Sequence, residues 1–432
     1  MTDIYEIAEY TLKALKDCGA DAAQCIVGRS KKDELNVDGG KFSLMRSTFN
    51  TSISMKAIKD GKKGVTSINQ ATKEAIDEAA AQCIAAAESS VPDEAEQIAP
   101  FTAKVEYKTG VFEPDLDKLF DRIEEFMSQT KKEYPKIILE QLISDYEHSE
   151  KLYMNTNGTS LRYEHGEYSF NTMFSAHEGE KASSFNGYFC ALDNLDKPFM
   201  DAGMQRQLLE ESEKQLDTVS PSEKFVGKVI YSPDCFNELL QTALENFASS
   251  GVLIDGTSPW KDALNTKVAS EKLNLRSVPL DSRTVVGQRF TSDGYPAENM
   301  DIIVDGVLKT FILSQYGANK TGFPRALNGG NNLEVLPGDK TLEEMIAGID
   351  KGLIVNRFSG GQPSSNGDFS GVAKNSFLIE NGKVSSAVSE TMISGNIIDM
   401  LNNIVAISKE QTTDGLSFMP WAEFDGVTVS GK

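Results

Sequence analysis

The chain has 432 residues, of which 40% are hydrophobic and 25% charged, and its formal net charge is −21 at pH 7. This length allows two or three compact domains. No segment approaches the roughly 18 consecutive apolar residues of a membrane-spanning helix. An acidic surface repels DNA phosphates, whereas duplex binding depends on lysines and arginines that displace counterions. We therefore expect a globular protein without a membrane segment and without direct binding to nucleic acid.

The amino-terminal residues MTDIYEIAEY are acidic and helical in pattern, unlike the basic and apolar regions of a secretory signal. The cysteines are odd in number, lack metal-ligand spacing, and are Cys18, Cys25, Cys83, Cys190 and Cys235. Such cysteines are typical of reduced, mostly buried thiols. We expect a cytoplasmic protein without disulfides.

The first hundred residues predict a unit of helix, strands and helix. Apolar residues recur at helical spacing from 4 to 18, and Gly19 stands where a helix commonly ends. A second helical pattern covers 71–89. Between them, residues 34–68 alternate polar and apolar side chains and contain the turn signals "DGG" and "DG", which predicts a β-meander.

The next segment repeats this pattern after a helix expected at 115–133 and a strand at 136–148. In 155–189, alternating residues precede "EGEK", as they precede "DGKK" in the first meander. The two alternating sets are Phe49, Thr51, Ile53 and Met55, and Phe170, Thr172, Phe174 and Ala176. We interpret the two segments as one supersecondary unit used twice.

The repeat explains the stretch "HEGEK" at 177–181, which begins like a zinc-protease motif. Such a helix needs a second histidine about one turn after the first, so that both imidazoles face one ion. Lys181 and Ala182 occupy those positions. We therefore place Glu178 and Gly179 at a hairpin tip and His177 at a strand end.

A helix near 200–217 and the polar stretch 218–224 close the first half. We predict an N-terminal α+β region at 1–218, with related units at about 1–95 and 110–218, and a C-terminal β-rich domain at 222–432. The second half begins with a strand at 224–232 and a helix at 233–251, for which Pro233 is a start signal. Hairpins are expected at 302–313, 377–388 and 424–431, and helices at 341–352 and 394–407. The expected fold class is α+β, with short turns joining antiparallel strands.

Several strings in this order resemble the C-terminal domain of the TldD/PmbA family. They are "DIIVDGVLKTFILSQYGANKTG", "NNLEVLPGDKTLEEMI", "GDFSGVAKNSFLIENGKV", "ETMISGNIIDMLNNIVAI" and "FDGVTVSG". In the first half, "DGGKFSLMRSTFNTSISMKAIKDGKKGVTS" is similar to the family's first meander. The resemblance covers nearly the whole chain.

The resemblance implies one of two related subunits of a cytoplasmic bacterial protease complex that cleaves small or unfolded peptides and takes part in microcin maturation. An older label of the family is modulator of DNA gyrase. The TldD type binds zinc through a His-Glu-x-x-x-His helix and a cysteine near the chain end. The PmbA or TldE type lacks these ligands.

In this chain the resemblance aligns that helix with "PDCFNELLQTALENFASSG", which places Gln241, Thr242 and Asn246 at the motif positions. There is no histidine after His177 and no cysteine after Cys235. Neutral amides offer little affinity for zinc, and without the ion no water is activated for attack. We therefore expect a PmbA/TldE-type subunit with no catalytic residues, no metal and no cofactor of its own, and zinc in a TldD-like partner.

Candidate peptide contacts are Asn332, Leu333 and Glu334, which follow two glycines, because β-rich surfaces can bind an extended peptide as an added strand. An ordinary loop and core strand explain this stretch equally well. Asp368, in a Gly- and Ser-rich segment, is a further candidate for orienting a substrate or partner, and its alternative role is to cap a turn.

Two other functions remain open. A stand-alone hydrolase would need a base beside a nucleophile, and the histidines, His148, His165 and His177, all lie in or near strands of the first half without a nucleophile-elbow motif. An adaptor or structural protein would bind a partner without a role in cleavage. A homo-oligomer is also compatible with the sequence, although it would leave catalysis unexplained.

Overall fold

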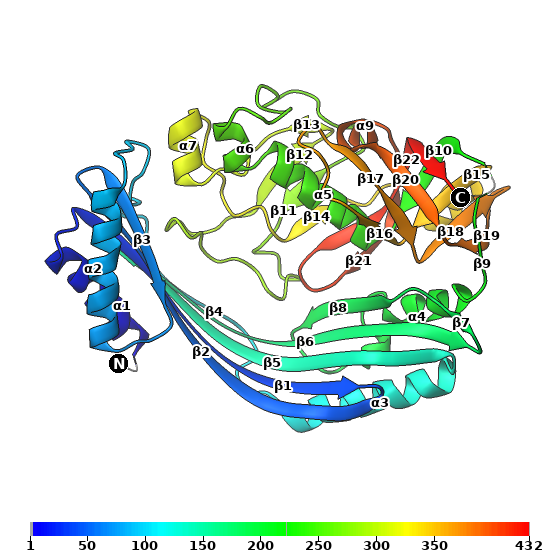
Figure 1. The fold of residues 1–432 in the computed structure, drawn as a ribbon, viewed down its shortest axis with the longest axis horizontal. Coiled ribbons are helices and arrows are strands. Elements are labelled where there is room, and N and C mark those ends of the chain that lie inside the picture. Colours follow the sequence, from blue (N-terminus) through cyan, green and yellow to red (C-terminus); the bar gives the residue numbers. More distant parts are fainter. Residues whose placement is uncertain (1–2, 222, 432) are drawn as a thin grey trace.

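Two β-sheets organise the computed structural model, which describes residues 3–221 and 223–431. The strands of the first sheet lie in the order β3-β2-β1-β5-β6-β4, with β7 and β8 also paired to β6. This sheet forms a long, bent ribbon, and the second sheet with its helices lies over it (Figure 1). The mixture of helices with largely antiparallel sheets confirms the predicted α+β class.

Within residues 3–221, the first half contains four α-helices, a short 3-10 helix and the strands of the first sheet. In chain order its elements are α1 (Ile4–Asp17), β1 (Ala22–Asp38), β2 (Lys41–Lys59), β3 (Lys62–Ile68), α2 (Lys73–Ser89), β4 (Lys104–Gly110), α3 (Leu116–Glu133), β5 (Ile137–Asn155), β6 (Ser160–Glu178), β7 (Lys181–Ala182), β8 (Asn186–Leu192), η1 (Phe199–Asp201) and α4 (Gln205–Lys214).

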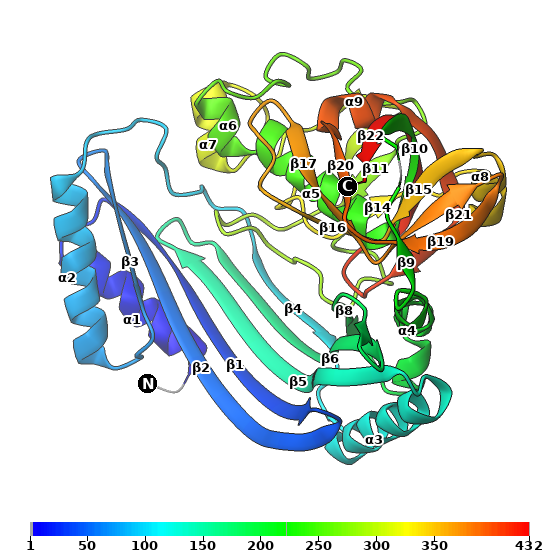
Figure 2. The same cartoon turned by 45° about the vertical axis from the view of Figure 1, so that its right-hand side comes forward.

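The hairpins β1–β2 and β5–β6 meet where β1 pairs antiparallel with β5. Helices α1 and α2 pack at one end of the sheet, and α3 and α4 lie at the other end (Figure 1, Figure 2). The hairpin predicted at "HEGEK" is confirmed, with His177 near the end of β6. Its turn is formed by Gly179 and Glu180, one residue later than predicted.

The described part of the second half forms the second sheet and five helices. Its elements are β9 (Thr218–Val219), β10 (Phe225–Tyr231), α5 (Pro233–Phe247), α6 (Ser250–Ile254), β11 (Leu275–Ser277), β12 (Met300–Val304), β13 (Val307–Leu308), α7 (Gln315–Thr321), β14 (Leu333–Val335), α8 (Leu342–Ala347), β15 (Lys351–Val355), β16 (Arg357–Gly360), β17 (Asp368–Lys374), β18 (Ser376–Glu380), β19 (Lys383–Val388), β20 (Thr391–Asn396), α9 (Ile397–Asn402), β21 (Ile404–Thr413) and β22 (Phe418–Ser430).

Several local predictions for the second half are confirmed. Hairpins join β12 to β13 and β18 to β19, and helix α8, expected at 341–352, begins with a capping box of Thr341 and Glu344. The sheet is not purely antiparallel, since β10 pairs parallel with β15, β14 with β22, and β9 with β19. The predicted pattern of antiparallel strands joined by short turns therefore describes most of this sheet but not all of it.

Several predicted elements were wrong in extent, among them the helix expected at 341–352, which ends at Ala347 as α8. The helix expected at 200–217 is divided into η1 and α4, because Gly203 between them has a φ of +46°. The helix expected at 394–407 is only α9, flanked by strands β20 and β21. The hairpin expected at 424–431 is instead part of the single strand β22, in which Asp425 and Gly426 form a bulge opposite β10.

The two halves share one hydrophobic core at the α4 end of the first sheet. Leu208 and Leu209 of α4 pack there with Phe170 from the first sheet and with Ile354 and Phe377 from the second. Strand β8 adds backbone contact, since the Ala191 N–H donates to Asp414 O at 2.8 Å. This end therefore fixes the second sheet over β8.

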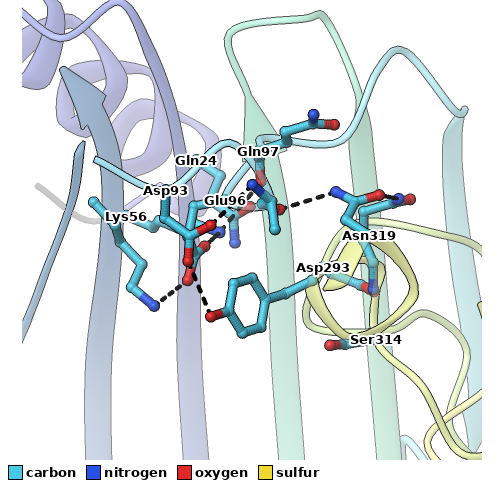
Figure 3. A network of polar contacts seen from close by, with 12 residues as sticks. Gln24, Lys56, Asp93, Glu96, Gln97, Asp293, Ser314 and Asn319 are labelled. Carbon is cyan, nitrogen blue, oxygen red and sulfur yellow. Dashed lines mark hydrogen bonds and ion pairs between the residues drawn. The ribbon is translucent and has the colours of Figure 1, made fainter. Parts of the chain in front are cut away.

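A polar contact joins the halves at the other end of the first sheet, between the segment 93–97 and α7 (Figure 3). The Tyr316 hydroxyl donates to Asp93 Oδ2 at 3.1 Å, and the Asn319 amide donates to Ala95 O at 2.9 Å. Lys320 pairs with Asp93 at 2.9 Å. The second half therefore bridges the first sheet from end to end.

No helix within the described ranges is long and apolar enough to cross a membrane.

Candidate functional site

A cavity of about 700 Å³ lies between the two sheets, and we call it the central cavity. Its first-sheet residues come mainly from β1, β2, β5 and β6, and its other residues come from α5 and from three loops of the second half. The lining includes Ile26, Gly28, Ser30, Asn50, Ser52, Ser149, Lys151, Tyr163, Asn237, Gln241, Gln288, Arg289, Phe290, Asn332, Leu333 and Ser417. This volume is typical of pockets that enclose a small ligand or part of a peptide.

Small residues on one face of the first sheet form the floor of the cavity. Gly28 pairs with Ser52 on one side and with Lys151 on the other, and residues directly opposite each other project to the same face. Ser30 and Ser149 form the next pair on this face. A Cβ on Gly28 would lie 2.7 Å from Ser52 Oγ, so the floor is closely fitted at this point.

Helix α5 forms the opposite wall. The Ser232 hydroxyl caps its first turn by accepting from the Cys235 N–H, and Pro233 occupies the first turn, as the sequence predicts. Phe236, Leu240 and Phe247 are buried in the main core of the second half. The polar face of the helix is therefore directed toward the cavities around it.

Gln241 and Asn237 on that face line the central cavity. Their side chains are adjacent, with the Gln241 amide donating to Asn237 Oδ1 at 3.4 Å. Thr242 lines a separate pocket of about 330 Å³ beside Phe358 and Phe369. Glu238 lines that pocket too, together with a third cavity of about 520 Å³ that contains Asp234, Asn237 and Asp414. Adjacent cavities therefore follow the length of α5.

Carboxyl groups near the start of α5 are protonated more easily than usual. Desolvation raises the pKa of Asp234 to about 6, with Asp414 and Glu238 adding like-charge repulsion. Desolvation also raises the pKa of Glu238. In α4, burial raises the pKa of Glu211 to about 7, although its carboxylate accepts from Gln207 and Asn356. The carboxyl groups of Asp234 and Glu211 therefore change charge near neutral pH.

Asn332 joins three loops that form the upper wall of the central cavity. Its φ is +53°, and its side-chain amide donates to Val286 O at 2.9 Å and to Leu416 O at 3.0 Å. Leu333, the next residue, is buried and also lines the cavity. The structure thus brings Gln241, Asn332 and Leu333 to one cavity, although separate features of the sequence led to their selection.

The other chosen residues lie elsewhere. Glu334 is buried on β14, where its carboxylate pairs with Arg283 at 2.7 Å. Asp368 begins β17 and accepts from the amides of Asn366 and Asn396 at 3.0 and 2.9 Å. Asn246, in the last turn of α5, does not line the central cavity. These three residues therefore do not line the central cavity with Gln241.

The side chains at the motif positions of α5 do not fit a zinc ion. They are two amides and a hydroxyl, whereas zinc sites are built from imidazole, thiolate and carboxylate groups. Cys235 is buried in the core below the helix, and burial raises the pKa of its thiol well above the usual range. Among residues 3–221 and 223–431, no group of three or more His, Cys, Asp or Glu side chains could hold a metal ion.

The histidines lie in the first sheet, away from α5. His148 contacts Glu164 at 3.1 Å, and His177 contacts the Ser175 hydroxyl at 3.0 Å. His165 is 2% exposed, with Nδ1 2.8 Å from Thr109 Oγ1 and Nε2 2.5 Å from a Glu167 oxygen. The order hydroxyl, imidazole, carboxylate resembles a hydrolase triad, but the burial of His165 gives a substrate no access to the base.

Lys151, Arg289 and Gly28 also line the central cavity but were not predicted from the sequence. Gly28 had a usable signal, because a glycine inside a strand often marks close approach of another group. Lys151 and Arg289 are separated by more than one hundred residues in the chain, and no local pattern links them. Their meeting depends on the register of β5 and on the path of the loop before β12.

Comparisons with known proteins agree on one family. Residues 224–431 match the PmbA/TldA metallopeptidase C-terminal domain, and residues 23–87 match domain 1 of the same metallopeptidases. The chain is 31% identical over 155 residues to Metalloprotease PmbA of Escherichia coli O157:H7. This match covers 35% of this chain and 34% of that protein. It is 29% identical over 195 residues to a zinc metalloprotease TldD homolog of Saccharolobus solfataricus, covering 42% and 44% of the two chains.

Solved structures share the whole fold. TldE from Thermococcus kodakarensis superimposes with a TM-score of 0.84 at 22% identity, over 98% of this chain and all of that chain. A Bacteroides thetaiotaomicron protein described as a modulator of DNA gyrase gives a TM-score of 0.83 at 24% identity over the full length of both. The sequence matches are shorter, and the chain spans less than half the length of the curated relatives named above.

Proposed function

This chain belongs to the PmbA/TldD family of metallopeptidases, and we propose that it is a PmbA/TldE-type subunit that holds peptides for a zinc-bearing partner. The observation that carries the proposal is the polar face of α5. There the side chains of Gln241, Thr242 and Asn246 stand where the resemblance places the metal ligands and base of the TldD type. Amides and a hydroxyl supply neither a zinc site nor a general base.

The central cavity supports the peptide-binding part of the proposal. Its floor is a β-sheet face of small residues, and its walls carry the amides of Asn237, Gln241, Gln288 and Asn331. Amide side chains both donate and accept hydrogen bonds, as does a peptide backbone. A site of this kind recognises an extended backbone with little regard to its side chains, which suits small or unfolded peptides.

The partner in this proposal is a TldD-like chain, because hydrolysis then takes place at zinc that the partner contributes. A homo-oligomer would contain the same amide groups at every copy of α5, so it would lack the metal. Reduced cysteines suit a cytoplasmic setting, and all five are free thiols.

Metal analysis and peptidase assays test the proposal together. The chain is purified alone and also mixed with a TldD-type protein, and cleavage of a set of unstructured peptides is measured in each sample. We expect no tightly bound zinc and no cleavage by the chain alone, and cleavage in the mixture that exceeds that of the TldD-type protein by itself.

Other outcomes distinguish the alternatives. Cleavage by the isolated chain with stoichiometric zinc would overturn the proposal and identify a complete enzyme. Cleavage without metal would favour a stand-alone hydrolase and direct attention to the carboxyl groups near Asp234. If the mixture cleaves no faster than the TldD-type protein alone, the chain is an adaptor without a role in cleavage.

A further inference from the structure

Two cationic side chains line the central cavity without a carboxylate partner among the described residues. Lys151 projects from β5 on the floor, and its Nζ lies 5.8 Å from the centre of the Phe290 ring. The Arg289 guanidinium lies 5.8 Å from the centre of the Tyr163 ring and donates to Pro279 O. These are unusual environments for positive charges in a chain whose net charge is −21.

The carboxylates near these cations are already engaged. Glu150 directly precedes Lys151 in β5, so its side chain projects to the opposite face of the sheet, where it binds Arg162 at 2.5 Å. Asp414 Oδ1 accepts from the backbone N–H groups of Leu416 and Ser417 at 2.8 and 2.7 Å. Among the described residues, neither carboxylate forms an ion pair with Lys151 or Arg289.

The Lys151 ammonium is partly removed from water and also lacks a carboxylate partner among the described residues. Protein packed around the cavity lowers the pKa of the Lys151 ammonium, with no charged neighbour contributing to the shift. An anion that enters the cavity stabilises the charged form of Lys151, because it supplies hydrogen bonds and charge interactions in place of those that water would have supplied. The aromatic rings of Phe290 and Tyr163 keep the two cations in place but cannot replace a counter-ion.

We propose that the central cavity selects peptides that carry a carboxylate, which is bound by Lys151 on the floor and by Arg289 on the wall. This inference rests on the proposed function, since it names a class of peptide for the same site. The carboxylate is either the C-terminal group of the peptide or an Asp or Glu side chain, and both have the same charge and shape. A dianion such as phosphate is less suited, because the cavity lies within a strongly acidic protein.

The experiment measures affinity with matched pentapeptides of alanine and serine. One carries a free C-terminal carboxylate, the second is amidated, and two amidated peptides contain a central Glu or its isosteric Gln. We expect at least one carboxylate peptide to bind about tenfold more tightly than its amide, the factor that one charge-assisted hydrogen bond typically contributes. The pair that shows the preference identifies the source of the carboxylate.

Substitution at the site gives the second readout. Lys151→Met keeps the length of the side chain and removes its charge, so it should abolish the preference while the amidated peptide binds as before. Lys383→Met serves as the control, because Lys383 is exposed on β19 and does not line the cavity. Circular dichroism and thermal unfolding establish that both variants fold. Arg289→Lys, which keeps the charge, should retain part of the preference.

Each remaining outcome counts against the inference. Equal affinity for carboxylate and amide peptides overturns it and leaves the proposed function standing. An equal loss of affinity for both peptides in Lys151→Met also overturns it, since Lys151 would then act without regard to charge. If inorganic phosphate binds while the peptides show no preference, the site takes a different anion. If no peptide binds, both this inference and the peptide-holding role are wrong.

Discussion

Gly294 of the second half lies directly against Tyr153 of β5, at a distance that only a glycine permits. A Cβ on Gly294 would lie 2.3 Å from Tyr153 Cζ, and the φ of Gly294 is +94°. The Thr102 hydroxyl also donates to Gly294 O at 2.7 Å. This contact fixes the loop that carries Arg289 and Phe290 above the first sheet.

Gly294→Ala should therefore loosen the contact between the halves. The backbone strain and the clash with Tyr153 together predict a loss of about 2–4 kcal/mol in the free energy of unfolding, measured with urea. Gly251→Ala is the matched control, because nothing lies within 4 Å of a Cβ at that position in α6. That variant should be unchanged or more stable by up to about 1 kcal/mol. Equal stability of Gly294→Ala and the parent protein would contradict the close approach.

Asn332 is predicted to act by positioning the cavity wall. Asn332→Gly keeps a residue that tolerates a positive φ but removes two hydrogen bonds, and we expect a loss of about 1–2 kcal/mol in stability. Asn332→Ala should lose about 1 kcal/mol more, because alanine is strained at this φ. Chemical denaturation of both variants checks the order.

Asn265 supplies the control for this pair. Its φ is +63°, it is exposed, and its backbone N–H bonds to Leu308 O. Asn265→Gly should leave stability within about 0.5 kcal/mol of the parent, since glycine adopts this conformation freely. A loss at position 265 as large as that at 332 would show that backbone conformation, and not the side-chain hydrogen bonds, explains the effect of Asn332→Gly.

The contact between Asp93 and α7 should contribute to stability in a pH-dependent way. Lys320 holds the pKa of the Asp93 carboxyl below its usual range, so this contribution is present above the unfolded-state pKa and is lost as pH falls through the lower folded value. Asp93→Ala should lower the free energy of unfolding at pH 7 and speed hydrogen exchange in 93–97. Asp17→Ala, in the exposed pair with Lys13, should change stability less than Asp93→Ala does.

Glu211 should make the protein less stable as pH rises. Burial raises its pKa to about 7, so the folded chain holds a proton that the unfolded chain releases above its ordinary pKa near 4.5. Stability then falls as pH increases from about 5 to 8. Glu211→Gln should remove this part of the slope and be about 2 kcal/mol more stable than the parent at pH 8, with little difference at pH 5.

Thermal unfolding over this pH range compares Glu211→Gln with Glu245→Gln, a change at an exposed position of α5. Glu245→Gln should follow the parent curve. Parallel curves for the parent and Glu211→Gln would mean that Glu211 is ionised in the folded protein throughout the range.

Elements with strong local signals could be predicted from the sequence. Helix α5 combines Ser232 and Pro233 at its start with apolar residues at helical spacing, and the turns at Gly39–Gly40 and Asn381–Gly382 require residues that tolerate positive φ. Strand β4 was missed because none of its residues is buried and its parallel partner β6 lies far along the chain. Phe49 belongs to the predicted alternating set but is 73% exposed, since β3 pairs with β2 only from Ile53 onward.

The candidate site shows the same division. The family resemblance led to Gln241, and the stretch that follows two glycines led to Asn332. Nothing in the sequence placed the two residues at one cavity. That cavity depends on the register in which Gly28 faces Lys151, which is set by the pairing of two distant hairpins. Long-range register follows from the packing of the whole sheet and has no local signature.

The core shared by α4 and both sheets also determines what happens if the backbone is broken between the halves. Leu208 and Phe377 meet in that interior, and β9 pairs with β19 across the same connection. A nick after Pro221 would leave these contacts intact. Two pieces made from separate reading frames would therefore reassemble into the native shape, and the protein could serve as a split reporter whose signal measures that reassembly.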